Sequence, residues 1–177
     1  LLEANKRLNQ QTEIVEQQVN ERTEELHQEQ SRFLAAIESI SAGFLLTDID
    51  GKILLSNIKF GEILEIKSQK FDIKIIQEHF KGYFDLTSEL YTASKEKKSK
   101  TYDNVSIGTK YLRVYVAPVF MGQSKDKVVG VVTVLNDVTE ATMLERAKEE
   151  FFSIASHELR TPLTAIKGNT EMVKEHI

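Results

Sequence analysis

The first 38 residues contain neither glycine nor proline, and this feature constrains the fold more than any other. Glutamate, glutamine, arginine and asparagine dominate the segment, and its few apolar residues recur at heptad spacing. They form two tracks, which are Leu1, Leu8 and Val15, and Val19, Leu26, Phe33 and Ile40. We predict one continuous helix, roughly 55 Å long at about 1.5 Å per residue.

Polar residues interrupt both tracks of this helix. Arg22 and Glu29 break the first track, and Thr12 breaks the second. Charged residues in an apolar seam weaken a coiled coil. We therefore expect the seam to hold only where another part of the chain brings two copies together. A solvated single helix is the alternative.

Between about residues 33 and 139 the pattern becomes that of an α+β domain. Alternating apolar residues predict strands, 3–4 spacing predicts helices, and Asp48–Gly51 predicts a hairpin turn. We expect two strands first, at 43–47 and 52–56. Helical segments should follow at 57–66, 67–83 and 86–98, and a three-stranded meander at 101–107, 110–120 and 128–136. This order predicts a five-stranded antiparallel sheet with helices.

Three short motifs in this region resemble those of PAS domains. They are Ile37-Glu38-Ser39-Ile40-Ser41-Ala42-Gly43, Asp48-x-Asp-Gly51 and Asp137-Val138-Thr139. Asp and Thr are also good capping residues for a following helix. The resemblance implies a PAS-like sheet flanked by long coiled-coil-like helices, with a linker at 1–32, the domain at 33–139 and a signalling helix at 140–177. Another α+β domain with a five-stranded sheet is the alternative.

A histidine and a carboxylate are adjacent in the segment after this domain. On one helix, His157 and Thr161 lie about 40° apart around the axis, and Glu158 lies beside the histidine. A neutral imidazole next to a carboxylate is a nucleophile with a base at hand. Pro162 has no N–H to donate to the carbonyl of Glu158, so we expect the helix to bend or loosen one turn below the histidine.

The unbroken run S-H-E-L-R-T-P-L, from Ser156 to Leu163, resembles the H-box of sensor histidine kinases of two-component systems. The resemblance implies that His157 accepts a phosphoryl group from ATP and passes it to a response-regulator aspartate. Glu158 would be the general base, Thr161 would position water for phosphatase activity, and Arg160 would pair with a carboxylate or organise the helix. A chance histidine on an amphipathic helix is the alternative.

The same resemblance implies a homodimer with a four-helix bundle, and a separate ATP-binding domain. None of the eight glycines lies two residues from another, so the sequence lacks even a minimal Gly-x-Gly phosphate loop. We therefore expect the ATP site to lie outside this chain and the chain to be inactive alone. Asn169 stands where the family usually has an aromatic residue.

Composition excludes several other functions. The net charge of −4 gives no basic excess for nucleic acid binding, and the absence of cysteine excludes disulfides and thiolate catalysis. The apolar run Val128–Leu135 is interrupted by glycine and indicates a buried strand, not a membrane span. We expect a cytoplasmic module, which a membrane-anchored parent could carry.

The signal or ligand of the PAS-like domain is not evident from the sequence. His79 is the one histidine in its helices, which leaves haem as an alternative, but no histidine has metal-ligand spacing to a partner. No cofactor or metal site is therefore expected in this chain. The alternatives to a kinase segment are a non-catalytic PAS dimerisation module and a small-ligand-sensing module.

Overall fold

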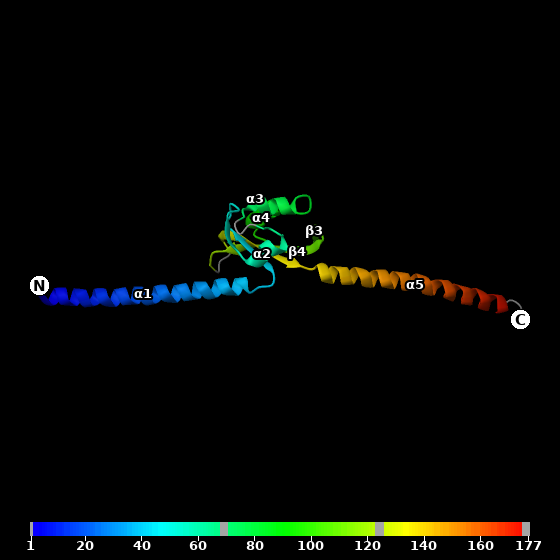
Figure 1. Ribbon diagram of the computed structural model, residues 1–177, viewed down its shortest axis with the longest axis horizontal. Helices are drawn as coiled ribbons and strands as arrows, with labels where there is room; N and C mark the ends of the chain where they lie inside the picture. The colour runs from blue at the N-terminus through cyan, green and yellow to red at the C-terminus, as the bar shows by residue number, and fades with distance from the viewer. Residues whose placement is uncertain (1, 68–70, 123–125, 175–177) are drawn as a thin grey trace.

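Two long helices leave a central α+β domain in opposite directions (Figure 1). The computed structural model describes the backbone of residues 2–67, 71–122 and 126–174, and the side chains of residues 11–160 within those ranges. The first helix, α1, spans Leu2–Glu38, and the last, α5, spans Thr139–Lys174. The long flanking helices predicted from the sequence are confirmed. The helix α5 continues through Pro162, so the loosening expected there does not interrupt it.

The domain contains one five-stranded sheet in the order β2-β1-β5-β4-β3, and all neighbours are antiparallel. The strands are β1 Gly43–Thr47, β2 Ile53–Ser56, β3 Lys100–Ile107, β4 Lys110–Phe120 and β5 Val128–Asp137. The predicted sheet is therefore confirmed. Its first and last strands in sequence, β1 and β5, lie side by side, which brings the end of α1 close to the start of α5.

The hairpin between β1 and β2 is closed by one aspartate. Asp48 Oδ1 accepts hydrogen bonds from the backbone N–H groups of Asp50, at 3.0 Å, and Lys52, at 2.8 Å. Gly51 adopts φ +83°, a left-handed conformation that glycine adopts without steric cost. These contacts explain why the Asp-x-Asp-Gly motif forms a turn.

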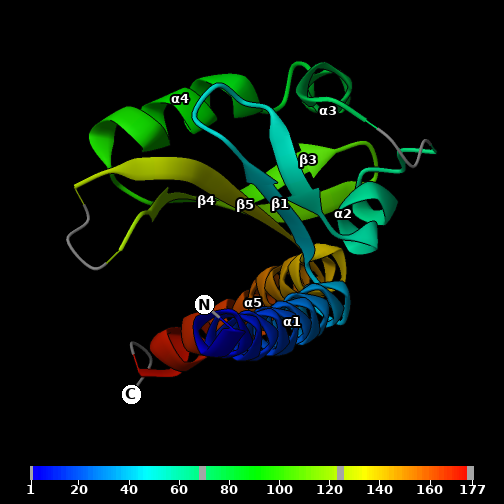
Figure 2. The ribbon, with the colours of Figure 1, turned by 90° about the vertical axis from the view of Figure 1, so that its left-hand side faces the viewer.

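Three short helices cover one face of the sheet, namely α2 Ile58–Ile63, α3 Ile73–Phe80 and α4 Leu86–Glu96. Each begins after a polar residue whose side chain accepts a backbone N–H of the first turn, and these caps are Asn57, Asp72 and Asp85. In Figure 2, α3 and α4 lie above the sheet, whereas α1 and α5 both lie below it.

The core lies between the sheet and these three helices. Its largest fully buried apolar side chains come from both layers: Phe60, Phe80, Leu45, Ile76, Leu86, Leu112 and Leu135. Each side chain of this size contributes about 1.5–3 kcal/mol when it is fully buried. A Cβ at Gly130 on β5 would collide with the carbonyl oxygen of Thr47, so only glycine permits the close approach of β1 and β5 there.

Candidate functional site

The start of α5 is fixed to the domain by the Asp137-Val138-Thr139 motif. Asp137 Oδ1 accepts hydrogen bonds from Thr139 N, at 3.0 Å, and Thr139 Oγ1, at 2.5 Å. Thr139 Oγ1 also accepts from Tyr111 N at 2.9 Å, and Val138 N donates to Tyr111 O at 2.9 Å. Asp137 therefore accepts the first backbone N–H of α5, as its predicted capping role requires, whereas the hydroxyl of Thr139 connects α5 to β4.

The electrostatic environment of Asp137 favours its charged form. Partial burial acts to raise its pKa, but the hydrogen bonds from Thr139 and the charges of Lys110 and Lys59 outweigh this effect. The pKa of Asp137 is thus lowered from its ordinary value. At neutral pH Asp137 is therefore ionised, and its carboxylate accepts the first backbone N–H of α5.

Two further contacts hold the first turns of α5 against β3 and β4. Thr142 Oγ1 donates to Asn104 Oδ1 at 3.1 Å, and Asn104 adopts a left-handed φ of +57° within an irregularity of β3. One turn later, Arg146 donates to the Tyr111 hydroxyl at 2.5 Å, and its guanidinium lies 4.5 Å from the centre of that ring. The first two turns of α5 are therefore positioned by the domain.

Beyond these turns α5 carries the predicted site residues on an exposed surface. His157, Glu158 and Arg160 are all exposed and lie within about one turn of the helix. The helix alone thus brings His157 and Glu158 together as neighbours. The side chain of Thr161 lies outside the described residues, although its backbone is part of α5.

A seam of exposed apolar side chains runs along the same helix. Leu144 is 71% exposed, Phe151 66% and Ile154 56%. At about 100° per residue, Glu158 falls within about 40° of Phe151 and Ile154, whereas His157 falls about 60° from Ile154 and about 120° from Phe151. Burial of the seam would therefore leave His157 at its side, accessible to a partner.

The helix α1 carries a matching seam. Its exposed apolar side chains lie at the heptad positions predicted from the sequence, and they include Val15, Val19, Leu26 and Phe33. These side chains are 55–65% exposed, which is unusual for residues of this size in such a regular row. Leu1 and Leu8 of the predicted tracks lie outside the described side chains.

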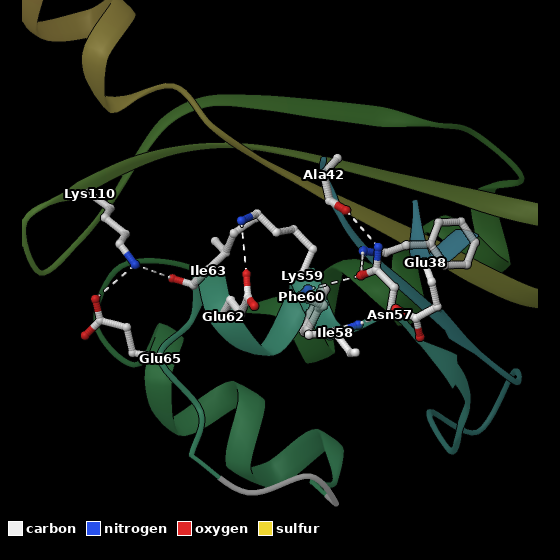
Figure 3. Close-up of polar contacts among 11 residues, drawn as sticks. Glu38, Ala42, Asn57, Ile58, Lys59, Phe60, Glu62, Ile63, Glu65 and Lys110 are labelled. Atoms are coloured by element: carbon white, nitrogen blue, oxygen red, sulfur yellow. Dashed lines mark hydrogen bonds and ion pairs between the residues drawn. The ribbon is translucent and has the colours of Figure 1, made fainter. Parts of the chain in front are cut away.

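The end of α1 is joined to the domain by a buried amide (Figure 3). Asn57 is 2% exposed, and its Nδ2 donates to Ile37 O at 3.1 Å and to Ala42 O at 2.9 Å. Its Oδ1 accepts from Phe44 N at 2.8 Å and Phe60 N at 3.1 Å. All the hydrogen-bonding groups of this amide are therefore used.

Several of these positioning residues were not identified from the sequence. Asn57, Asn104 and Tyr111 contact residues 15 or more positions away, so no local pattern indicates those contacts. Only the N-cap role of Asn57 had a local signal, which is a short polar residue directly before an apolar helix.

Two features bear on ligand binding by the domain. His79 Nδ1 donates to Ile75 O at 2.9 Å on the surface of α3, which engages the ring in its own helix. An open hollow of about 1050 Å³ lies along the free edge of β2, between that strand, α2 and Phe71.

No described helix is long and apolar enough to cross a membrane.

Comparison with known proteins agrees with this organisation. Residues 147–176 match the His Kinase A (phospho-acceptor) domain. The sensor protein kinase WalK of Staphylococcus epidermidis is 29% identical over 150 residues, covering 83% of this chain and 23% of that protein. WalK of Staphylococcus haemolyticus is 46% identical over 50 residues, covering 28% of this chain and 8% of that protein. The chain thus spans less than a quarter of the length of these curated relatives.

Solved structures share the fold at low sequence identity. An RNA-binding Light-Oxygen-Voltage receptor superposes with a TM-score of 0.50 and 14% identity, covering 72% of this chain and 38% of that one. The PAS domain of BvgS from Bordetella pertussis gives a TM-score of 0.47 and 17% identity, covering 71% of this chain and 98% of that one. Residues 147–176 are thus similar to a His Kinase A phosphoacceptor segment, and over most of its length the chain is similar to a sensor protein kinase, with a five-stranded α+β domain before that segment.

Proposed function

We propose that this chain transmits a signal from its PAS-type domain to His157, which accepts a phosphoryl group from ATP. The observation that carries the proposal is the phosphoacceptor match over residues 147–176, on a helix where His157 is exposed. The ATP-binding domain and the receiver domain of a response regulator are the partners this reaction requires. The chain then acts as the phosphoryl carrier, and alone it is inactive.

The proposed roles follow from the chemistry of each side chain. An imidazole nitrogen of His157 attacks the γ-phosphorus of ATP, the bond to the bridging oxygen breaks, and ADP leaves. Glu158 polarises the ring through its other nitrogen and takes up the proton as general base. The phosphoryl group then passes to a carboxylate oxygen of the receiver aspartate. Thr161 positions a water for hydrolysis of that aspartyl phosphate, and Arg160 organises the helix or pairs with a carboxylate.

A parallel homodimer is part of the proposal. The apolar seams of α1 and α5 are exposed in one chain, and both helices lie on the same side of the sheet (Figure 2). Two chains side by side could therefore bury both seams together along one two-fold axis. His157, at the side of the α5 seam, would stay accessible to the catalytic domain.

The proposal assigns a linker to residues 1–32, the sensor domain to 33–139, and the signalling and phosphoacceptor helix to 140–177. It places the module in the cytoplasm, where ATP and receiver domains are found.

Phosphorylation of the full-length parent tests the proposed function. With labelled ATP, the protein should gain an acid-labile phosphate, and His157→Gln should gain none. His79→Gln is the matched control, because His79 is a helical histidine that lies outside the S-H-E-L-R-T-P-L run, and it should label normally. Undiminished labelling of the His157 variant would refute the assignment.

A further inference from the structure

The short helix α2 is fixed at both of its ends to the elements that join the flanking helices to the domain (Figure 3). At its N-terminal end, Asn57 Nδ2 donates to Ile37 O, and Ile58 N donates to Glu38 Oε2 at 3.0 Å. Ile37 and Glu38 are the last two residues of α1. Any movement of the end of α1 is therefore applied to the start of α2.

The C-terminal end of α2 is held by one lysine. Lys110 Nζ donates to Ile63 O, the last carbonyl of the helix, at 3.0 Å, and lies 2.9 Å from Glu65 Oε1. A cation is favourable at this position, because the carbonyl groups at a helix C-terminus carry partial negative charge. Lys110 is only 26% exposed, whereas Glu65 is 75% exposed, so the lysine is the more constrained partner.

The backbone at this end of α2 adopts a conformation that is unusual for its sequence. Glu65 N donates to Glu62 O, and Ile66 N donates to Gly61 O, which together form the helix ending in which glycine is usual. Glu65 occupies the left-handed position, with φ +58°. A non-glycine residue there is disfavoured, and such strain persists where surrounding contacts hold it. The ion pair with Lys110 is such a contact.

Lys110 also begins β4, directly before the residue that holds α5. Tyr111 pairs through its backbone with Val138 and Thr139, and through its ring and hydroxyl with Arg146. A continuous series of contacts thus runs from α1 through Asn57, α2 and Lys110 to Tyr111 and α5. The charge of Lys110 also favours the ionised form of Asp137 in the motif that caps α5.

We propose that α2 couples the end of α1 to the start of α5, and that Lys110 is the positioning residue that makes this coupling. The inference deepens the proposed function, because it names the route by which a change in α1 reaches the phosphoacceptor helix. The pairing of β1 with β5 also joins the two helices, but it does so through a backbone ladder. The route through α2 depends on one side chain, so it can be cut without breaking the sheet.

Hydrogen exchange of the 177-residue chain tests the coupling without ATP, so failure of the coupling leaves the assignment of His157 intact. Lys110→Met keeps the length and apolar stem of the side chain and removes its charge. We expect amide exchange to become about threefold to tenfold faster in three places: 64–66, the last turn of α1, and residues 142–146 of α5. Lys81→Met is the matched control, because Lys81 pairs with Glu78 beside α3, and it should change none of these segments.

Two comparisons separate coupling from simple support of the fold. Asn57→Asp removes the two N–H donors of the amide, one of which binds the last turn of α1. This substitution should speed amide exchange at 142–146 in the wild-type chain, and it should have little further effect there in a chain that already carries Lys110→Met. Glu65→Gln weakens the same contact while leaving the bond to Ile63 O, and it should give the same pattern at smaller amplitude. Faster exchange confined to 64–66, uniformly faster exchange that includes the centres of β4 and β5, or additive effects of the two substitutions would overturn the proposal.

Discussion

Replacement of Asn57 by alanine should destabilise the domain far more than a usual surface substitution. The side chain makes four hydrogen bonds and is 2% exposed. Two partners keep a second contact, because Ile40 N still donates to Ile37 O, and Phe60 N still donates to Asn57 O. Ala42 O and Phe44 N lose the amide altogether.

The cost follows from these losses. An N-cap contributes about 1 kcal/mol, and each buried group left without its partner costs about 1–3 kcal/mol. Allowing for partial hydration of the opened site, we expect Asn57→Ala to lower the free energy of unfolding by about 2–4 kcal/mol. This is a large share of the stability of a domain of this size.

The substitution to aspartate separates the acceptor role from the donor role. Asn57→Asp keeps an acceptor for Phe44 N and Phe60 N, but places a carboxylate against the carbonyl oxygens of Ile37 and Ala42. The pKa of the new carboxyl should rise in the folded state, because only the protonated acid can donate there. Stability of this variant should therefore fall as pH rises from about 4, the ordinary value of an aspartate, through the raised folded-state pKa.

Urea denaturation followed by tyrosine fluorescence measures these changes, since the chain has five tyrosines and no tryptophan. Asn136→Ala, at an exposed position at the end of β5, is the matched control and should stay within about 0.5 kcal/mol of wild type. An Asn57→Ala variant as stable as this control would refute the role of the buried amide.

Three further predictions concern assembly, pH and the two activities. The chain should form a dimer that dissociates on dilution, because Arg22 and Glu29 interrupt its seam; light scattering that shows only monomer up to millimolar concentration would contradict this. The stability that Asp137 contributes should be present above about pH 4 and be lost as pH falls through its lowered folded-state pKa. In an acid titration followed by circular dichroism, Asp137→Asn should remove this contribution to the loss of stability. In the full-length parent, Thr161→Ala should keep most autophosphorylation and lose about 10–100-fold of phosphatase activity, a contact worth about 1.4–2.7 kcal/mol; equal dephosphorylation rates would remove Thr161 from the site.

Much of this fold could be predicted because its signals are local. Alternating apolar residues in Lys110–Phe120 give the long strand, and the Asp48–Gly51 turn sets the first hairpin. The H-box needs only its own helix, because neighbouring positions on one helix already bring His157 beside Glu158. These features depend on residues a few positions apart, which a single sequence displays.

The contacts that connect the helices to the domain could not be predicted in the same way. Lys110 binds a carbonyl 47 positions earlier in the chain, and Arg146 binds a tyrosine 35 positions earlier. Lysine and arginine are abundant on any surface, so neither residue type indicates such a partner. Only the sheet order, which places β4 beside β5 and α2 near the start of β4, brings these groups together.

The central claim is that His157 carries the phosphoryl group, and peptide mapping tests it most directly. Trypsin should release Glu149–Arg160 as one peptide, in which His157 is the only histidine and Ser153 and Ser156 are the only hydroxyl residues. After incubation of the full-length parent with ATP, this peptide should gain the mass of one phosphoryl group, with fragment ions that locate it on His157 and with loss of the group in acid. An unmodified peptide in a phosphorylated protein, or an acid-stable phosphate on Ser153 or Ser156, would contradict the account.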